Sequence, residues 1–129
     1  PWDSALVLGE IWHAAAALNT IYDASLATQP LAVSGPFPLG RLWELDAGGF
    51  RQAVADRWFE LRSGVLQDAS LYASIGDAFD LITKSGARER EAKRWPDGAA
   101  CADNSFVEAF LGQRLSYLDA FFAEYRAPE

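Results

Sequence analysis

The sequence is poor in the side chains that most often build catalytic or metal-binding sites. Among 129 residues there is one cysteine, Cys101, one histidine, His13, and no methionine. A single cysteine excludes a disulfide framework within the chain, and one Cys with one His excludes the usual four-ligand structural zinc sites. The sequence places no partner beside either side chain. We therefore interpret His13 as a helix-surface or satisfied buried histidine rather than a general base, and Cys101 as an incidental thiol rather than a nucleophile.

Long apolar runs and an excess of positive charge are missing too. The longest apolar stretches, such as residues 14–18, are far shorter than the ~20 residues that a helix needs to cross a bilayer, so no membrane span is predicted. Eleven basic against eighteen acidic residues give a net charge of −7, which repels phosphate backbones and argues against nucleic-acid partners. Glycine-rich phosphate loops, the Gly-x-Ser-x-Gly elbow and His-Glu-x-x-His are absent as well.

The residues that are present favour helices around one core. The chain is 50% hydrophobic, and we predict a single helical domain over residues 1–129. The predicted class is mainly α, a four-helix domain with a short N-terminal strand or turn as an optional addition. Three prolines and two glycines predict a loop over Gln29–Gly40. The four helices are expected over Glu10–Ala27, from Phe50 to about Gly64, from about Ser70 to Arg94, and from Ser105 to Tyr125.

The clearest predicted helix follows Gly48-Gly49. Its apolar residues recur at steps of four, four, three and four, which places them on one face: Phe50, Val54, Trp58, Leu61 and Val65. Charged and polar residues occupy the opposite face, so this helix is predicted to pack on the core. Gly64 stands where a left-handed C-terminal cap would fall.

The next helix carries an apolar face at helical spacing: Leu71, Ile75, Phe79 and Ile82. Asp68 or Ser70 is predicted as its N-cap, and a break is expected at Gly86 because glycine lowers helix propensity. From Arg88 to Arg94 acidic and basic residues alternate. We interpret this charged stretch as a solvent-exposed helix face held by salt bridges rather than as a docking strip.

The last predicted helix opens with Ser105-Phe-Val-Glu108, the pattern of a capping box. Its wide apolar face consists of Phe106 or Val107, Phe110, Leu111, Leu115, Leu118, Phe121, Phe122 and Tyr125. Because Phe121, Phe122 and Tyr125 cover a broad arc, we expect that one core does not hide all three. This favours one hypothesis for function, a stand-alone helical module that binds a protein partner or self-associates without catalysis.

A second hypothesis rests on an ordered set of motifs. They are Pro1-Trp2-Asp3-Ser4-Ala5-Leu6-Val7-Leu8-Gly9, then Phe50 with Arg57-Trp58-Phe59-Glu60-Leu61-Arg62, then Arg94-Trp95-Pro96, then Arg114 with Leu118-Asp119. This order resembles the C-terminal part of the spore coat protein H (CotH) kinase-like family. There a Trp-Asp-x-Asp…Gly turn precedes a helix with Arg-Trp-x-x-Leu-Arg, an Arg-Trp pair and a final helix with Arg-x-x-x-Leu-Asp. The resemblance covers most of the chain and is weakest over Glu10–Gly40.

The resemblance implies an atypical protein kinase fold in which this chain forms part of the helical C-lobe of a larger protein. Such kinases transfer the γ-phosphoryl group of ATP to spore coat or secreted proteins, so a secreted or spore-coat location is implied too. Phosphoryl transfer needs carboxylates that hold Mg²⁺ against the phosphates. Asp3 matches the family's metal-holding turn and is the implied metal ligand. Ala5 stands where the family has a second Asp, and its side chain cannot ligate a cation.

The remaining motif residues resemble scaffold, and we expect Arg57 or Arg62 to pair with acids on a neighbouring helix. The chain contains no phosphate-covering loop, no candidate nucleotide lysine and no catalytic-base segment. We therefore assign no catalytic residue and expect the isolated chain to be inert. By resemblance, its partners are Mg²⁺, ATP, the rest of the kinase fold and a protein substrate. A small enzyme that uses His13 with Asp23 is a third alternative, and no spacing supports it.

Overall fold

The computed structural model describes residues 24–30, 38–94 and 104–126, and these ranges are helical without a strand. The prediction of a mainly α protein is therefore confirmed for the described residues. The optional N-terminal strand or turn lies outside them, as does most of the predicted helix Glu10–Ala27. The elements are a 3-10 helix η2 (Ala24–Thr28) and the α-helices α1 (Pro38–Leu45), α2 (Phe50–Arg62), α3 (Asp68–Lys84), α4 (Ala87–Arg94) and α5 (Ser105–Ala123).

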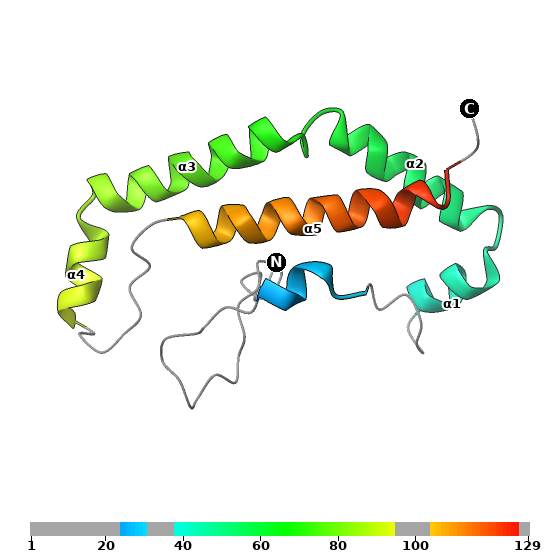
Figure 1. Cartoon of the computed structure of the whole chain (residues 1–129), viewed down its shortest axis with the longest axis horizontal. Helices are drawn as coiled ribbons and strands as arrows, with labels where there is room; N and C mark the ends of the chain where they lie inside the picture. The colour runs from blue at the N-terminus through cyan, green and yellow to red at the C-terminus, as the bar shows by residue number, and fades with distance from the viewer. Residues whose placement is uncertain (1–23, 31–37, 95–103, 127–129) are drawn as a thin grey trace.

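Helix α5 lies in the middle of the described part of the molecule (Figure 1). Helices α2 and α3 run along one side of it, and η2 and α1 lie along the other side. Helix α5 contacts η2, α2 and α3, whereas α1 packs on α2 and α4 packs on α3. The arrangement is an open helical layer in which α5 supplies the central surface.

Helix α1 is the element that sequence reasoning missed. The predicted loop Gln29–Gly40 is wrong over Pro38–Gly40, where the helix begins. Proline is tolerated in the first helical turn because the amide hydrogen that it lacks has no partner within the helix there. Gly40 is buried in this helix. The rest of the predicted loop, residues 31–37, lies outside the described residues.

Trp43 of α1 covers the aromatic end of α5. Its ring centroid lies 5.6 Å from that of Phe121, 6.4 Å from that of Phe122 and 5.0 Å from that of Tyr125. Trp43 and Phe122 are buried together with Ala55 of α2, and Phe121 and Tyr125 pack against this cluster. The expectation that one core would not hide the three rings is confirmed, since Phe122 is buried whereas Phe121 and Tyr125 are only half-buried, even with Trp43 of the missed helix packed over them.

A turn with left-handed backbone angles holds α1 against α2. Asp46 has a φ of 47°, and Gly48 and Gly49 have φ values of 68° and 74°. Arg51 Nε donates to the carbonyl oxygen of Trp43 at 2.7 Å, and its Nη2 donates to that of Glu44 at 3.0 Å. The Arg51 guanidinium therefore satisfies carbonyls at the end of α1, which fixes Trp43 over the core.

The apolar face of α2 is mostly as predicted. Phe50, Val54 and Trp58 pack against the buried cluster. Val65 is the exception, since α2 ends at Arg62 and the Val65 side chain is 69% exposed. The C-terminal cap is Ser63 in right-handed conformation rather than the predicted Gly64.

The predicted break in the third helix is confirmed at Gly86, whose φ of 67° separates α3 from α4. The N-caps differ from the predictions: α3 is preceded by Gln67, and α5 by Asn104. Asn104 Nδ2 donates to Glu108 Oε1 at 2.6 Å. The Glu108 side chain thus accepts a hydrogen bond from Asn104, the residue before the Ser105 of the predicted capping box. No residue of α3 is buried, and Ile82 of its predicted apolar face is 47% exposed.

Candidate functional site

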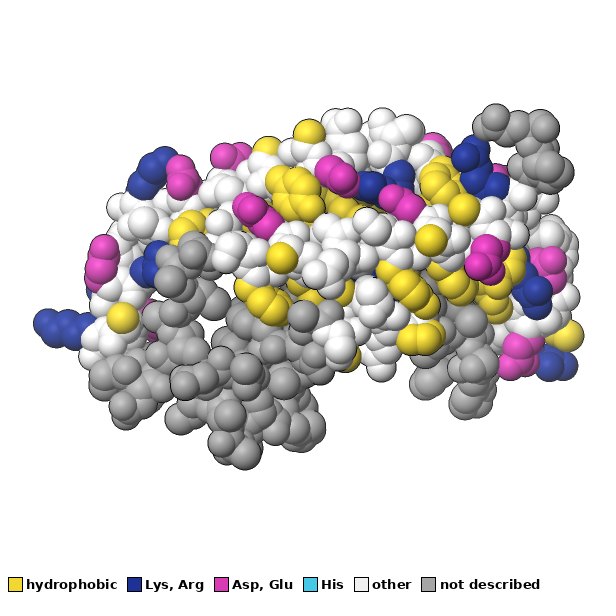
Figure 2. Space-filling view, viewed as in Figure 1, with side chains coloured by type: hydrophobic (Ala, Val, Ile, Leu, Met, Phe, Trp, Pro, Cys, Tyr) yellow, Lys and Arg dark blue, Asp and Glu magenta, His cyan; other side chains and the backbone are white. Residues whose placement is uncertain are grey.

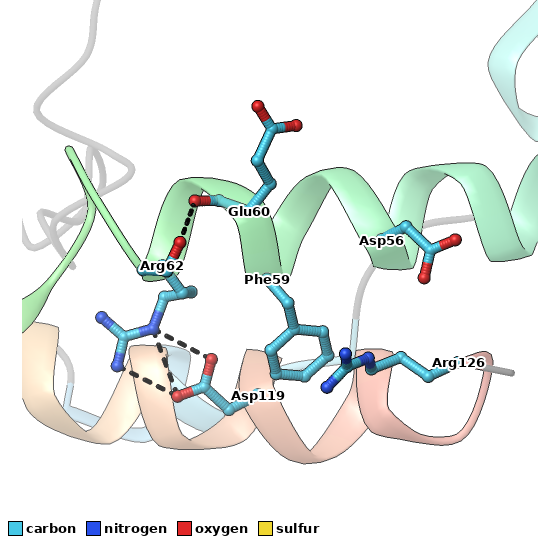
Figure 3. Close-up of a pocket in the computed structure, with 7 residues that line it drawn as sticks. Asp56, Phe59, Glu60, Arg62, Asp119 and Arg126 are labelled. Atoms are coloured by element: carbon cyan, nitrogen blue, oxygen red, sulfur yellow. Dashed lines mark hydrogen bonds and ion pairs between the residues drawn. The ribbon is translucent and has the colours of Figure 1, made fainter. Parts of the chain in front are cut away.

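Asp119 of α5 is the centre of a polar network between α2 and α5. Trp58 Nε1 donates to Asp119 Oδ1 at 2.8 Å. Arg62 binds the same carboxylate in a bidentate manner, with Nε 3.0 Å from Oδ1 and Nη2 3.1 Å from Oδ2. Two side chains one helical turn apart on α2 thus converge on one carboxylate of α5 (Figure 3 shows the Arg62 part).

Arg62 also ties the start of α3 to this network. Its Nη1 lies 2.7 Å from Asp68 Oδ1 and donates to the carbonyl oxygen of Leu66. The Arg62 side chain is only 16% exposed. The hydrogen bond to Asp119 raises the pKa of Arg62 above its usual value, with a smaller contribution from Asp68, while burial acts in the opposite direction. Arg62 therefore stays charged and joins α2, α3 and α5.

A shallow groove of about 740 Å³ opens beside the network. Its lining residues are Asp56, Phe59, Glu60, Arg62, Ser63, Asp119 and Arg126. Phe59 points down between the two helices, and the Arg126 guanidinium lies 4.6 Å from the centre of its ring (Figure 3). Glu60 points away from α5 and pairs with Arg57 on its own helix at 2.6 Å.

The chemistry of this arrangement is that of a structural clamp. The Asp119 carboxylate accepts three N–H groups, so both of its oxygens are occupied by donors of the protein. A bidentate guanidinium–carboxylate pair adds orientation as well as energy. Within the described residues, no group of three His, Cys, Asp or Glu side chains could hold a metal ion. We therefore read the network as scaffold.

The expected pairing of Arg57 or Arg62 with acids on a neighbouring helix is confirmed, and Arg62 is the residue that forms it, whereas Arg57 pairs within α2. Asp119 could have been found from the sequence by its position. It lies four residues after Leu115 and three before Phe122, so it is a carboxylate in the core-facing row of α5. A carboxylate at such a position needs a charged or hydrogen-bonding partner from the facing helix.

Arg114 of α5 has a scaffold role as well. Its Nη1 donates to the carbonyl oxygens of Gln29 at 2.6 Å and Ala27 at 3.3 Å. These bonds tie α5 to the end of η2. Of the other residues singled out from sequence, the implied metal ligand Asp3 lies outside the described residues, as do His13 and Cys101.

Comparison of the chain with models of protein families, with curated proteins and with solved structures gave no match. The resemblance to the CotH kinase-like family thus stays a prediction. Among the helices described here, none has the length and apolarity that crossing a membrane requires.

Proposed function

We propose that this chain is a C-lobe portion of a CotH-like atypical protein kinase, and that its own contribution is to hold the lobe together. The observation that carries the proposal is the contact of Trp58 and Arg62 with Asp119. These residues belong to two motifs of the resemblance that are 57 positions apart in the sequence, measured from Arg62 to Asp119. Motifs that are far apart in the sequence and meet in one network are expected if they support one scaffold.

A rigid scaffold is useful to phosphoryl transfer because that reaction depends on positioning and on neutralising charge. ATP and Mg²⁺ belong to the intact protein in this proposal, with Asp3 as metal ligand by resemblance. The described residues offer no metal-binding group of their own, and Ala5 removes one carboxylate of the family's turn. We therefore assign this chain no step of the transfer and expect it to be inert alone.

The test is a thermal melt of the longest native form of the protein, with and without Mg²⁺–ATP. A ligand that binds the folded state stabilises it by about 2.7 kcal/mol at a hundredfold excess over Kd. The proposal predicts a rise in Tm that Asp3→Asn abolishes and Asp77→Asn, an exposed carboxylate of α3, leaves in place. No rise at saturating nucleotide would contradict the kinase assignment, and a rise that Asp3→Asn does not change would remove Asp3 from the metal site.

A helical protein-interaction module without catalysis is the second candidate. It is favoured by helix α1, where Leu39 and Leu45 are 68% and 58% exposed and Leu42 is exposed beside them. Apolar side chains of this size at the surface are typical of contact surfaces. This candidate predicts no response to nucleotide, together with weaker self-association or partner binding after Leu39→Gln and Leu45→Gln.

A further inference from the structure

Basic charge is concentrated in one corner of the molecule. Residues 84–94 contain five basic and two acidic side chains, a net charge of +3. The other described residues carry six basic and ten acidic side chains, a net charge of −4. Figure 2 shows blue side chains projecting from the end of the molecule where α3 turns into α4. The described part of the chain is therefore polarised, with one cationic end on an acidic body.

The interpretation of this stretch as an exposed helix is confirmed, since no residue of α4 is buried, but Arg88, Arg90 and Lys93 form no salt bridge among the described residues. The ion pairs among them join Arg41 to Glu44, Arg57 to Glu60, Arg62 to Asp68 and Asp119, and Lys84 to Asp80. None of these pairs involves Arg88, Arg90 or Lys93. The carboxylates Glu89 and Glu91 thus leave the cations Arg88, Arg90 and Lys93 without a carboxylate partner among the described residues.

The corner that presents these cations is fixed by local bonds. Gly86 turns the chain with a φ of 67°, and Arg90 Nη1 donates to the carbonyl oxygen of Ser85 at 2.8 Å. The Arg88 guanidinium lies over the Phe79 ring at 5.1 Å from its centre. Arg88 and Arg90 are therefore held in place by neutral groups and keep their full charge for another ligand.

Apolar surface and a hollow accompany the charge. Leu81 in the last turns of α3 is 70% exposed, and Ile82 beside it is 47% exposed. A hollow of about 260 Å³ between the two helices is lined by Thr83, Arg88, Glu89 and Ala92. The corner can thus accept an apolar side chain of a partner while its cations contact carboxylates of the same partner.

We infer that this corner, the end of α3 with α4, is a docking surface for a short acidic protein segment that carries an apolar residue. Charge complementarity selects an acidic partner, and the acidic body restricts it to a short one. Nucleic acids and anionic bilayers extend beyond the corner and would meet the net negative charge of the other described residues. Helix α4 also has only alanines as apolar residues, which gives it no face to insert into lipid. The inference is independent of the kinase proposal.

The experiment measures fluorescence anisotropy of a labelled peptide of glutamates around one leucine. The same peptide with lysine for glutamate, a labelled oligothymidine and vesicles containing phosphatidylserine are the comparison ligands. The test variant is Arg88→Gln with Lys93→Gln. The matched control is Arg41→Gln with Arg57→Gln, which removes the same charge from α1 and α2. Far-UV circular dichroism establishes that both variants keep their helix content, and Lys93→Gln alone replaces the double variant if α4 melts.

The glutamate peptide is expected to bind in preference to the other ligands, and more weakly as salt increases. The test variant should weaken binding by about fivefold, since exposed ion pairs contribute at most ~1 kcal/mol each, while the control variant leaves it unchanged. Absence of peptide binding, an equal loss in both variants, or preferential binding of oligothymidine or vesicles would each overturn the inference.

Discussion

Asp119 is the residue on which the packing of α2 against α5 depends most. Its carboxylate accepts hydrogen bonds from Trp58 and Arg62 and is itself partly exposed. The replacement Asp119→Asn keeps the shape and removes the charge, so Arg62 loses its bidentate partner and keeps only Asp68. We expect the free energy of unfolding to fall by about 2 kcal/mol, measured by urea denaturation.

The control is Asp56→Asn on the same groove. Asp56 is exposed and has no ion pair or side-chain hydrogen bond among the described residues, so its replacement should change stability by less than about 0.5 kcal/mol. Equal effects of the two substitutions would show that Asp119 has no special role.

The pH dependence of the clamp follows from Arg62. The folded state raises the pKa of Arg62 above its ordinary value, chiefly through the hydrogen bond to Asp119. A group with a raised pKa contributes stability that is complete below its unfolded-state pKa and is lost as the pH rises through the folded-state value. Protonation of Arg62 therefore adds no pH dependence to stability in the neutral range, and its contribution declines only in strong alkali.

At the scale of helices, the turn at Gly86 determines where α3 ends and α4 begins. Gly86 has a φ of 67°, and a Cβ added to it would lie 3.2 Å from Glu89 Oε2. We expect Gly86→Ala to destabilise the protein by about 1–2 kcal/mol, because the left-handed backbone conformation is less favourable by about that much for a residue with a Cβ. Gly76→Ala within α3 is the matched control. A Cβ there meets nothing within 4 Å, so helix propensity should stabilise by up to ~1 kcal/mol. The two Tm shifts should have opposite signs.

The contact of α3 with α5 can be tested at Gly112. A Cβ on Gly112 would lie 2.8 Å from the Tyr72 hydroxyl oxygen, which is too close. Gly112→Ala is expected to cost about 1 kcal/mol in the natural chain, because overpacking displaces the ring. In a Tyr72→Phe background the same substitution should be neutral or stabilising, since the clashing oxygen is gone. Thermal melts of the four proteins give the coupling, and an equal effect of Gly112→Ala in both backgrounds would argue against this approach of the helices.

The helices that sequence patterns predicted best are those with regular apolar spacing. The start of α2 and the break at Gly86 follow from such spacing and from glycine. Helix α1 could not be predicted in this way, because its start holds a proline and a glycine that are typical of loops. Tertiary packing of Trp43 over α5 outweighs that local preference.

At the scale of the whole molecule, the described helices form an open layer with a small core. The buried apolar side chains are Ala27, Trp43, Ala55, Phe110, Leu115 and Phe122. Composition predicted the helical class, and hydrophobic spacing predicted Phe110, Leu115 and Phe122 on the apolar face of α5. The charged stretch was placed correctly on a helix after Gly86. That Arg88, Arg90 and Lys93 have no ion pair among the described residues depends on side-chain geometry, which alternating charge in a sequence does not determine.

The proposed scaffold role depends on how α2 packs against α5. A scaffold role requires that the motif residues on α2 and α5 meet in the folded protein. Sequence alone predicted a pairing of Arg57 or Arg62 with some acid, and only the packing of α2 on α5 identifies Arg62 and Asp119 as the pair. The role of Asp3 as metal ligand, which the resemblance implies, is tested by the thermal melt of Asp3→Asn with Mg²⁺–ATP.

The most direct measurement of this account is a double-mutant cycle of Arg62→Gln and Asp119→Asn by urea denaturation. We predict a coupling energy of about 1–3 kcal/mol, because each substitution removes the same bidentate pair. A parallel cycle of Arg57→Gln with Asp119→Asn should be additive, since Arg57 pairs with Glu60 on its own helix. If Arg62 and Asp119 are also additive within about 0.5 kcal/mol, the two motifs do not meet as described and the scaffold account is contradicted.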